Sequence, residues 1–320
     1  THGKTTTTSL TAAVLSEGGL DPTFVIGGQL LAAGANAKLG GGQWLVAEAD
    51  ESDGSFLRLN PLVAVITNID ADHLENYGND FARVQAAFAE FLQRLPFYGL
   101  AVLCIDDPEV AALATQTPRH VMSYGLSDNA DVRAEDVAQD GARMRFTLRL
   151  PEGSSTPVTL ALPGRHNVLN ALAAASLALA AGIALPRVAE GLQQARPVAG
   201  RQVAHALPGG AVLVDDSYNA NPGSLAAAIA ALAAASEEGW LVLGDMRELG
   251  PDAEALHAQA GTRAREAGLK RLYALGPLSA AAAAAFGEGG RHFDSHAALA
   301  AALEADLHAG VRCLVKGSRG

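Results

Sequence analysis

Short, continuous apolar runs separated by stretches of helical periodicity dominate the first hundred residues of this chain. The clearest runs are Leu45–Ala47, Val63–Ile66 and Ala101–Ile105. A strand that is apolar at every position leaves no face for water, which is typical of parallel strands covered by crossover helices on both sides. The pattern therefore predicts an α/β fold built on a parallel central sheet.

The hydrophobic pattern changes twice further along the chain. Residues 142–150 and 158–162 alternate with a period of two around a Pro-Glu-Gly-Ser-Ser turn, which predicts an antiparallel hairpin appended to the first sheet, followed by a helix at about 167–182. From residue 200 strands and helices alternate again, which predicts a Rossmann-like, doubly wound α/β domain. Its expected strands are 211–214, 240–243, 271–275, 292–293 and 312–315, and its expected helices are 224–235, 252–267, 278–285 and 296–307.

Pro197 and Gly200 interrupt both helix and strand between these two regions. We therefore expect two domains, 1–196 and 197–320, which also agrees with a length of 320 residues. A hydrophobic content of 49% is ample for two packed cores.

The charge balance narrows the class of partner. With 34 acidic against 23 basic side chains the formal net charge is -11, which argues against a general nucleic-acid binder and favours small-molecule substrates. Cys104 and Cys313 lie in apolar runs and are expected to be buried hydrophobes of a protein in a reducing cytosol. No apolar stretch is long enough for a membrane span, and we expect a cytoplasmic protein without a signal peptide. The oligomeric state stays open.

A possible phosphate site lies at the start of the chain. Gly3-Lys4-Thr5 before an apolar helix matches the tail of a P-loop, in which helix amides and the lysine bind phosphates and the hydroxyl binds Mg²⁺. The full pattern needs a further Gly before Gly3, and the triplet alone is weak evidence. Glu48 and His73 follow two consecutive predicted strands, where metal ligands of such a site are expected. Taken singly, Glu48 and the run Asp50-Glu51-Ser52-Asp53 could instead form a solvated acidic loop, and His73 could be a helix-capping or satisfied loop histidine.

Several motifs together resemble the Mur ligase family. Residues 1–135, with THGKTTTT, VAEADESD and TNIDADH, resemble the central domain of its L-alanine-adding type, and residues 200–320, with VDDSYNANPGS and LVKGSR, resemble the C-terminal domain of its D-alanyl-D-alanine-adding type. The segment 162–170 is shared across the family. The resemblance thus implies a hybrid that switches type between about 130 and 200, with no counterpart of the family's N-terminal UDP-binding domain and weakened affinity for a UDP substrate.

The resemblance implies an ATP-dependent, ADP-forming amide ligase of peptidoglycan precursor synthesis. Residues 1–196 would be the ATP-binding domain, and the reaction would join L-alanine to the carboxylate of UDP-N-acetylmuramate through an acyl phosphate. Alternatives are addition of D-alanyl-D-alanine to a UDP-N-acetylmuramoyl-tripeptide, or an inactive nucleotide-binding scaffold. Folylpolyglutamate synthetase shares the architecture, but the Glu-Ala-Asp-Glu-Ser-Asp segment favours the alanine-adding ligases.

The resemblance also implies a role for each matching residue. The cofactors would be ATP and Mg²⁺. The implied catalytic residues are Lys4, His73 and Arg201; the nucleotide-binding residues are Gly3, Lys4, Thr5, Thr6, Asn167, Asn170, Arg201 and Asp216; the metal ligands are Thr5, Glu48 and His73; and the substrate-binding residues are Asn219, Asn221, Lys316, Ser318 and Arg319. Without the resemblance, the two asparagines of 167–170 could simply start a helix, Arg201 could be a surface residue, and the asparagines of 219–221 could form a turn.

The positions of the lysines distinguish between the types of Mur ligase central domain. Several Mur ligases hold a second Mg²⁺ with a carbamylated lysine downstream of the metal histidine, but the four lysines here are Lys4, Lys38, Lys270 and Lys316. None of them lies in the helix expected after His73. This pattern fits the alanine-adding type of central domain.

Overall fold

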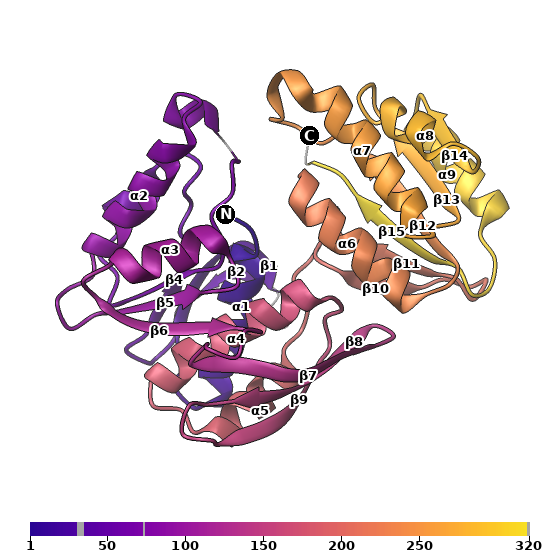
Figure 1. The fold of residues 1–320 in the computed structure, drawn as a ribbon. Coiled ribbons are helices and arrows are strands. Elements are labelled where there is room, and N and C mark those ends of the chain that lie inside the picture. The colour runs from indigo at the N-terminus through magenta and orange to yellow at the C-terminus, as the bar shows by residue number, and fades with distance from the viewer. Residues whose placement is uncertain (31–34, 73, 319–320) are drawn as a thin grey trace. The chain divides into compact units, whose positions relative to one another are not determined.

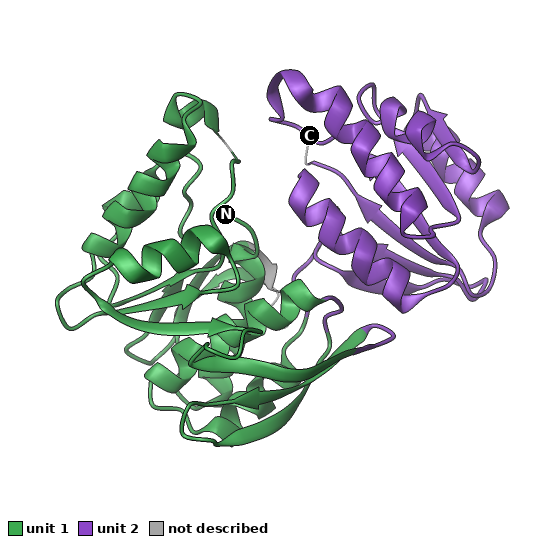
Figure 2. Cartoon of the chain, viewed as in Figure 1, with its two compact units in different colours: residues 1–138, 143–161, 165–196 green, residues 139–142, 162–164, 197–320 purple. Residues whose placement is uncertain are grey.

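A computed structural model describes residues 1–30, 35–72 and 74–318 of the chain (Figure 1). The described chain divides into two compact units, coloured separately in Figure 2. The first unit comprises residues 1–138, 143–161 and 165–196, and the second comprises 139–142, 162–164 and 197–320. Each unit is an α/β structure, as the apolar runs predict.

The first unit contains two sheets of order β2-β1-β3 and β4-β5-β6-β7-β8-β9. Its strands are β1 (Thr23–Leu30), β2 (Ala35–Lys38), β3 (Leu45–Ala47), β4 (Val63–Ile66), β5 (Leu100–Cys104), β6 (His120–Gly125), β7 (Val132–Asp140), β8 (Arg143–Arg149) and β9 (Ser155–Leu160). Its helices are α1 (Lys4–Glu17), α2 (Phe81–Gln93), α3 (Pro108–Gln116), α4 (Arg165–Ala180) and α5 (Leu185–Gln194), with short 3₁₀ turns η1 (Ser55–Arg58) and η2 (Leu74–Tyr77).

Strand direction in the first unit agrees with the expected α/β layer. β4, β5, β6 and β7 are parallel neighbours, and β8 pairs with β9 as the predicted antiparallel hairpin at the end of this sheet. β1 runs parallel to β3 and antiparallel to β2. The apolar runs do not reveal that β3 and β4 belong to different sheets.

The helices of the first unit pack for different reasons. α2 is capped by Asp80, whose side chain accepts a hydrogen bond from the Ala82 amide, and it turns Val84, Phe88 and Phe91 into the core. α4 is rich in alanine and is buried around most of its surface, because its small side chains let α1 and α5 approach closely. α2 and α3 lie above the sheet and α4 lies below it in the view of Figure 1.

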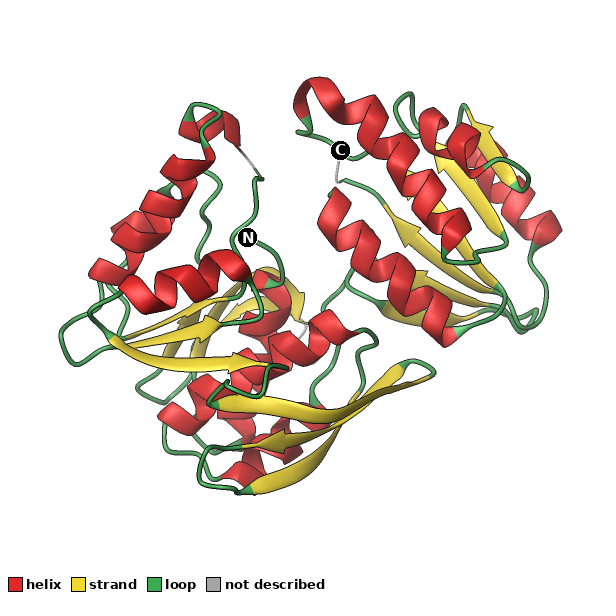
Figure 3. Ribbon diagram, in the orientation of Figure 1, coloured by secondary structure: helices red, strands yellow, loops and turns green. Residues whose placement is uncertain are grey.

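The second unit has one sheet of order β10-β11-β15-β12-β13-β14, in which all pairs are parallel except the edge pair β10 and β11. Figure 3 shows helices on both faces of this sheet. Its strands are β10 (Val203–Ala206), β11 (Val212–Asp215), β12 (Gly239–Gly244), β13 (Arg271–Leu275), β14 (Gly290–Phe293) and β15 (Arg312–Lys316), and its helices are α6 (Pro222–Ala235), α7 (Ala253–Glu266), α8 (Ala280–Phe286) and α9 (His296–Asp306), with a 3₁₀ turn η3 (Gly250–Asp252).

The core of the second unit follows from the continuous apolar run of β12. Leu241 and Leu243 pack with residues of α6, α7 and α8, whereas Trp240 and Val242 pack with residues of α9. Both faces of the strand are therefore buried, as expected for a doubly wound fold. The edge strand β10 has a single β-branched residue, Val203, and gave no strand signal in the sequence.

Burial of both cysteines is confirmed. The Cys104 and Cys313 thiols are free and buried, and burial raises their pKa values to about 11 and about 12. Along the described residues, no helix has the length and apolar character needed to cross a membrane.

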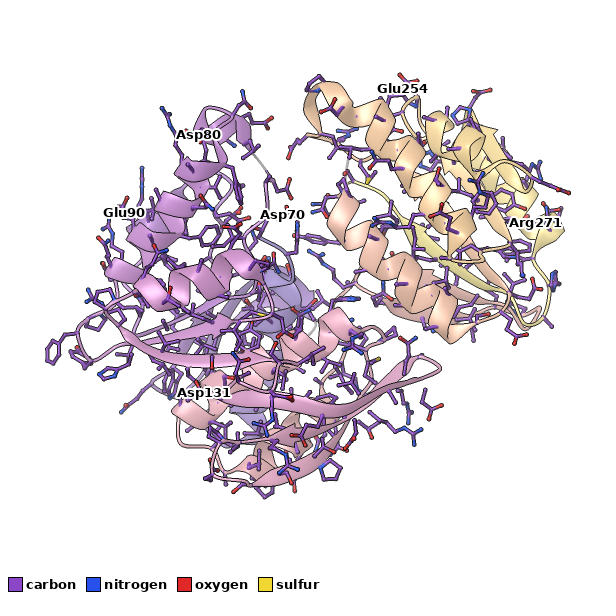
Figure 4. All side chains as sticks on the ribbon, viewed as in Figure 1. Asp70, Asp80, Glu90, Asp131, Glu254 and Arg271 are labelled. Carbon is purple, nitrogen blue, oxygen red and sulfur yellow. The ribbon has the colours of Figure 1, made fainter. Side chains whose placement is uncertain are left out.

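At one edge of the second unit, ionic and aromatic groups meet. Asp306 accepts hydrogen bonds from the Tyr273 hydroxyl at 2.6 Å and from Arg291 at 2.9 Å. The hydrogen bond from Tyr273 is the main cause that holds the pKa of the Asp306 carboxyl below its ordinary value. Arg271, labelled in Figure 4, lies over the Trp240 ring with 5.1 Å between the guanidinium carbon and the ring centroid.

Candidate functional site

The first turn of α1 is shaped by a glycine. Gly3 precedes the helix with a φ of 83°, in the left-handed region that favours glycine. A Cβ atom at this position would lie 2.3 Å from the Oδ1 atom of Asn170, so the space also requires glycine. The amides of the following helical turn have no intrahelical acceptor, which makes such a helix start a suitable anion site.

Thr5 and Glu48 meet beside this helix start. The Thr5 hydroxyl donates to Glu48 Oε1 at 2.9 Å, and the amide of Gly27 donates to Glu48 Oε2 at 2.7 Å. Both residues lie where the sequence predicts them, since Thr5 lies in the first turn of α1 and Glu48 directly follows β3. Two of the three sequence-predicted metal ligands are thus brought into contact.

Lys4 contacts two carboxylates of the next loop. Its ammonium group donates to Asp50 Oδ1 at 3.1 Å and also to Glu51 Oε2. Burial lowers the pKa of Lys4, but the two carboxylates outweigh this effect and raise it above its ordinary value, so the ammonium form is retained. These contacts use two of the three hydrogens of the ammonium group.

Glu51 is buried, which does not agree with the alternative of a solvated acidic loop. The residue is 4% exposed, and its second carboxylate oxygen, Oε1, has no hydrogen-bond partner among the described residues. The backbone oxygen of Glu51 accepts a hydrogen bond from the Tyr77 hydroxyl in η2. Nothing in the local sequence distinguishes this buried carboxylate from its exposed neighbours Asp50 and Asp53, so sequence reasoning did not single it out.

The loop after β4 is held to the start of the chain. The His2 amide donates to Asn68 Oδ1 at 2.7 Å, the Thr67 hydroxyl donates to the His2 carbonyl at 2.6 Å, and the His2 ring lies 2.9 Å from the carboxylate of Asp70. Asp70 is labelled in Figure 4. His73, the predicted third metal ligand, lies outside the described residues.

Asn167 and Asn170 lie near the same helix start. Neither of them caps α4, because that helix starts at Arg165, with Asn167 in its first turn and Asn170 in its second. Both side chains are buried; Asn170 accepts a hydrogen bond from the Thr7 hydroxyl at 3.2 Å and donates to Asn167 Oδ1 at 3.2 Å. This chain of amides joins α4 to α1 directly beneath Gly3.

The candidate residues of the second unit lie at the carboxyl ends of β11 and β15. Lys316 donates to Asp216 Oδ2 at 2.7 Å and to the carbonyl of Asn219 at 3.0 Å, and burial is the main cause that lowers the pKa of Lys316. The Ser318 hydroxyl donates to the carbonyl of Ala220 at 3.0 Å. These contacts hold the loop between β11 and α6 within the unit.

Asn221 and Arg201 also have local partners. The Asn221 side chain caps α6 by accepting a hydrogen bond from the Ser224 amide at 2.8 Å. Arg201 lies over the ring of Tyr218, with 4.2 Å between the guanidinium carbon and the ring centroid. Arg319 lies outside the described residues.

Comparison with known families identifies the chain. A model of the Mur ligase middle domain matches residues 1–178, and a model of the Mur ligase, glutamate ligase domain matches residues 200–319. The chain belongs to the Mur ligase family. The family resemblance seen in the sequence motifs is therefore confirmed.

Individual relatives extend this result. The chain is 75% identical over 245 residues to a UDP-N-acetylmuramate–L-alanine ligase of Xanthomonas campestris pv. campestris (strain B100), a match that covers 75% of this chain and 50% of the relative. The corresponding ligase of Xanthomonas oryzae pv. oryzae (strain PXO99A) is 74% identical over the same length. The chain thus spans about half the length of the curated relatives it matches.

Solved structures of both ligase types are similar to the chain. MurF from Acinetobacter baumannii is 27% identical with a TM-score of 0.84, and the match covers 99% of this chain and 72% of that one. MurC from Thermotoga maritima is 24% identical with a TM-score of 0.82, and the match covers 100% of this chain and 71% of that one. The second likeness establishes the fold alone.

The comparisons give no support to the expected hybrid. A match over 245 of 320 residues necessarily runs through the interval 130–200, where the change from one ligase type to the other was expected. Across that interval the chain is similar to L-alanine-adding ligases.

Proposed function

We propose that the chain is part of an ATP-dependent, ADP-forming ligase that joins L-alanine to UDP-N-acetylmuramate in the bacterial cytoplasm. The observation that carries this proposal is the 75% identity to a UDP-N-acetylmuramate–L-alanine ligase over 245 residues. The geometry around the start of α1 supports it, because a glycine-led helix start, a lysine and a threonine–carboxylate pair lie together there. We assign residues 1–196 to the ATP-binding domain and residues 197–320 to the C-terminal domain.

The nucleotide phosphates are proposed to bind at the start of α1. Amides of Lys4, Thr5 and Thr6, which follow Gly3, would face the phosphate oxygens, and the Lys4 ammonium would neutralise their charge. The difficulty of the reaction is that a carboxylate must approach a polyanion, so fixed positive charge near the phosphates lowers the barrier. Exchange of Lys4 from the Glu51 carboxylate to a phosphate would accompany nucleotide binding.

The donor set beside this helix suits Mg²⁺. Thr5 and Glu48 offer hydroxyl and carboxylate oxygens 2.9 Å apart, and Mg²⁺ commonly binds through one or two carboxylates together with substrate phosphates and water. We propose Thr5, Glu48 and His73 as the protein ligands. When bound, the ion would offset the phosphate charges. Asn167 and Asn170 would support the phosphate loop from α4.

Roles in the second unit are proposed from the family resemblance and the local contacts. Arg201 would contact the γ-phosphate, and Asp216 would lie near the ribose. Lys316 is proposed to act on substrate binding by fixing the loop that carries Asn219 and Asn221. Ser318 would help to fix the same loop, and Arg319 would lie beside the incoming amine.

The proposal is tested by nucleotide binding and phosphate release. We expect calorimetry to show that MgADP binding is lost in the variant Lys4→Ala and kept in the control variant Lys38→Ala. Among the described residues, the ammonium group of Lys38 contacts only the surface residue Asp21, at 2.9 Å. Phosphate release should require both UDP-N-acetylmuramate and L-alanine. Nucleotide binding that is equal in both variants would contradict the site assignment.

D-alanyl-D-alanine is the second candidate for the amine. The motifs of residues 214–224 and 314–319 resemble the D-alanyl-D-alanine-adding type, and the MurF structure from Acinetobacter baumannii is 27% identical to the chain. The phosphate-release assay separates the two candidates, since each amine is supplied in turn with the UDP-linked substrate that its ligase type uses.

A further inference from the structure

A pocket of about 630 Å³ lies at one edge of the sheet in the second unit. It is lined by Glu238 and Trp240 at the start of β12, by residues 269–271 at the start of β13, by residues 288–289 before β14 and by His308 before β15. These four strands are parallel neighbours, so the pocket lies at their amino ends. Its volume is in the range of pockets that bind small molecules.

This pocket is separate from the candidate site of the same unit. Asp216 and Lys316 lie at the carboxyl ends of β11 and β15, which is the opposite edge of the sheet. The strands β12 and β15 have six and five residues, and a strand rises about 3.3 Å per residue, so the two edges are about 15–20 Å apart. A ligand in this pocket would therefore not occupy the proposed ligase site.

The indole group of Trp240 offers a donor that no described residue satisfies. Trp240 is 1% exposed, and its Nε1 atom is buried without a hydrogen-bond partner among the described residues. An indole N–H can only donate, and buried polar side-chain atoms in folded proteins are nearly always paired. Because Trp240 lines the pocket, an acceptor atom bound there would satisfy this donor.

The ring next to this donor can move. The His308 ring packs edge-on against the Trp240 ring, with 5.8 Å between the two centroids. His308 is exposed, and its ring contacts the carbonyl of the neighbouring residue Ala309 at 3.0 Å. Exposed side chains change rotamer within nanoseconds. The His308 ring can therefore turn aside when an acceptor approaches the indole.

Charged groups of both signs line the same pocket. The side chains of Glu238, Lys270 and Glu288 form no hydrogen bond or ion pair with any residue in the described ranges, and so do not pair with one another. Arg271 lies over the Trp240 ring, with 5.1 Å between the guanidinium carbon and the ring centroid. Exposed charges alone are ordinary surface groups, but here they surround a buried donor that lacks an acceptor.

These groups together select the chemistry of a ligand. The indole N–H and the two cations of residues 270–271 favour a carboxylate, because charge-assisted hydrogen bonds to a carboxylate are strong. The carboxylates of Glu238 and Glu288 favour an ammonium group for the same reason. A ligand with one charge would leave one of the two sets without a partner.

We propose that this pocket binds a short peptide with free ends. The carboxylate of the peptide accepts a hydrogen bond from Trp240 Nε1 beside Lys270 and Arg271. Its ammonium group lies beside the two glutamates. The ends of a dipeptide are about 7 Å apart, so one molecule can reach charged groups that do not reach one another.

The test follows the indole N–H signals of the whole chain by nuclear magnetic resonance while the dipeptide L-alanyl-L-alanine is added. The chain has two tryptophans, Trp44 and Trp240, and the variant Trp44→Phe assigns their signals. We expect a saturable shift of the Trp240 signal alone. N-acetyl-L-alanyl-L-alanine lacks the ammonium group and L-alanyl-L-alanine amide lacks the carboxylate, so each should bind at least about tenfold more weakly.

Variants locate the site. Lys270→Ala and Glu288→Gln should each weaken the binding of the dipeptide at least about tenfold. The matched controls Lys38→Ala and Glu304→Gln change residues that do not line the pocket and should leave the affinity unchanged. Unchanged backbone amide signals of the second unit would show that each variant is folded.

Three results would overturn the proposal. The first is the absence of a saturable shift of the Trp240 signal. The second is equal binding of the dipeptide and its N-acetylated analogue, which would indicate a simple anion site. The third is equal affinity in the pocket variants and their controls. Because no nucleotide is present, failure here is distinguishable from failure of the proposed ligase function.

Discussion

Replacing Gly3 by alanine should destabilise the first unit more than replacing Gly54, which has a similar backbone conformation but open space around it. The left-handed backbone of Gly3, with a φ of 83°, costs an alanine about 1–2 kcal/mol. The new Cβ would lie 2.3 Å from Asn170 Oδ1, so the Asn170 amide must move and give up its hydrogen bonds to Thr7 and Asn167. At about 1 kcal/mol for each bond, the expected total loss is about 3–4 kcal/mol.

The control for this prediction is Gly54→Ala. Gly54 has a similar φ of 71°, but a Cβ there meets no atom within 4 Å, so only the backbone cost of about 1–2 kcal/mol remains. Urea unfolding followed by circular dichroism measures both variants. If Gly3→Ala costs no more than Gly54→Ala, the steric argument for Gly3 is wrong.

A double-mutant cycle isolates the steric contact. Asn170→Ala alone should cost about 2 kcal/mol, because it removes both hydrogen bonds of the amide. In the double variant Gly3→Ala/Asn170→Ala the overlap is absent, so its cost should fall short of the sum of the single costs by about 2 kcal/mol. Strict additivity would refute a direct contact between the two positions.

Three further predictions concern the second unit. The variant Lys316→Ala should lower the free energy of unfolding of this unit by about 3–5 kcal/mol, because Asp216 is left buried without its partner. In the same urea titration, the double variant Lys316→Met/Asp216→Asn should lower that free energy by less. The pKa of Asp306 is lowered in the folded state, chiefly by the hydrogen bond from Tyr273, so its stabilising effect is complete above the ordinary carboxyl pKa and is lost as the pH falls through the lower folded-state value. The variant Asp306→Asn should therefore remove this part of the acid dependence of Tm. A pH profile of Tm that is unchanged in the variant would contradict the assignment. Cys313, whose pKa is raised to about 12 by burial, should react with a thiol reagent at pH 8 only after urea is added, and fast labelling of the folded chain would show that the strand is accessible.

Much of the architecture followed from hydrophobic pattern. The runs at β3, β4 and β5 and the alternating hairpin of β8 and β9 were predictable because strand burial leaves a direct mark on the sequence. The α/β series of the second unit was predictable for the same reason. β10 was not, because an edge strand needs little apolar surface and its backbone pairing with β11 carries no side-chain signature.

The candidate site shows the same division. Gly3, Lys4, Thr5 and Glu48 could be named from the sequence because phosphate and metal chemistry restrict the residue types at a helix start and a strand end. The buried partner of Lys4 could not be named, since Glu51 stands among similar acidic residues and only packing decides which carboxylate is removed from water.

The sequence by itself determined which segments become buried strands, which family the chain resembles and which residue types could hold a phosphate. Only the tertiary structure decided that β3 and β4 belong to different sheets, and that Gly3 lies against Asn170 although 167 positions separate them along the chain. The physical reason is that periodicity records how each residue meets solvent locally. Strand neighbours and contacts across long sequence separations are instead selected by the packing of the whole unit.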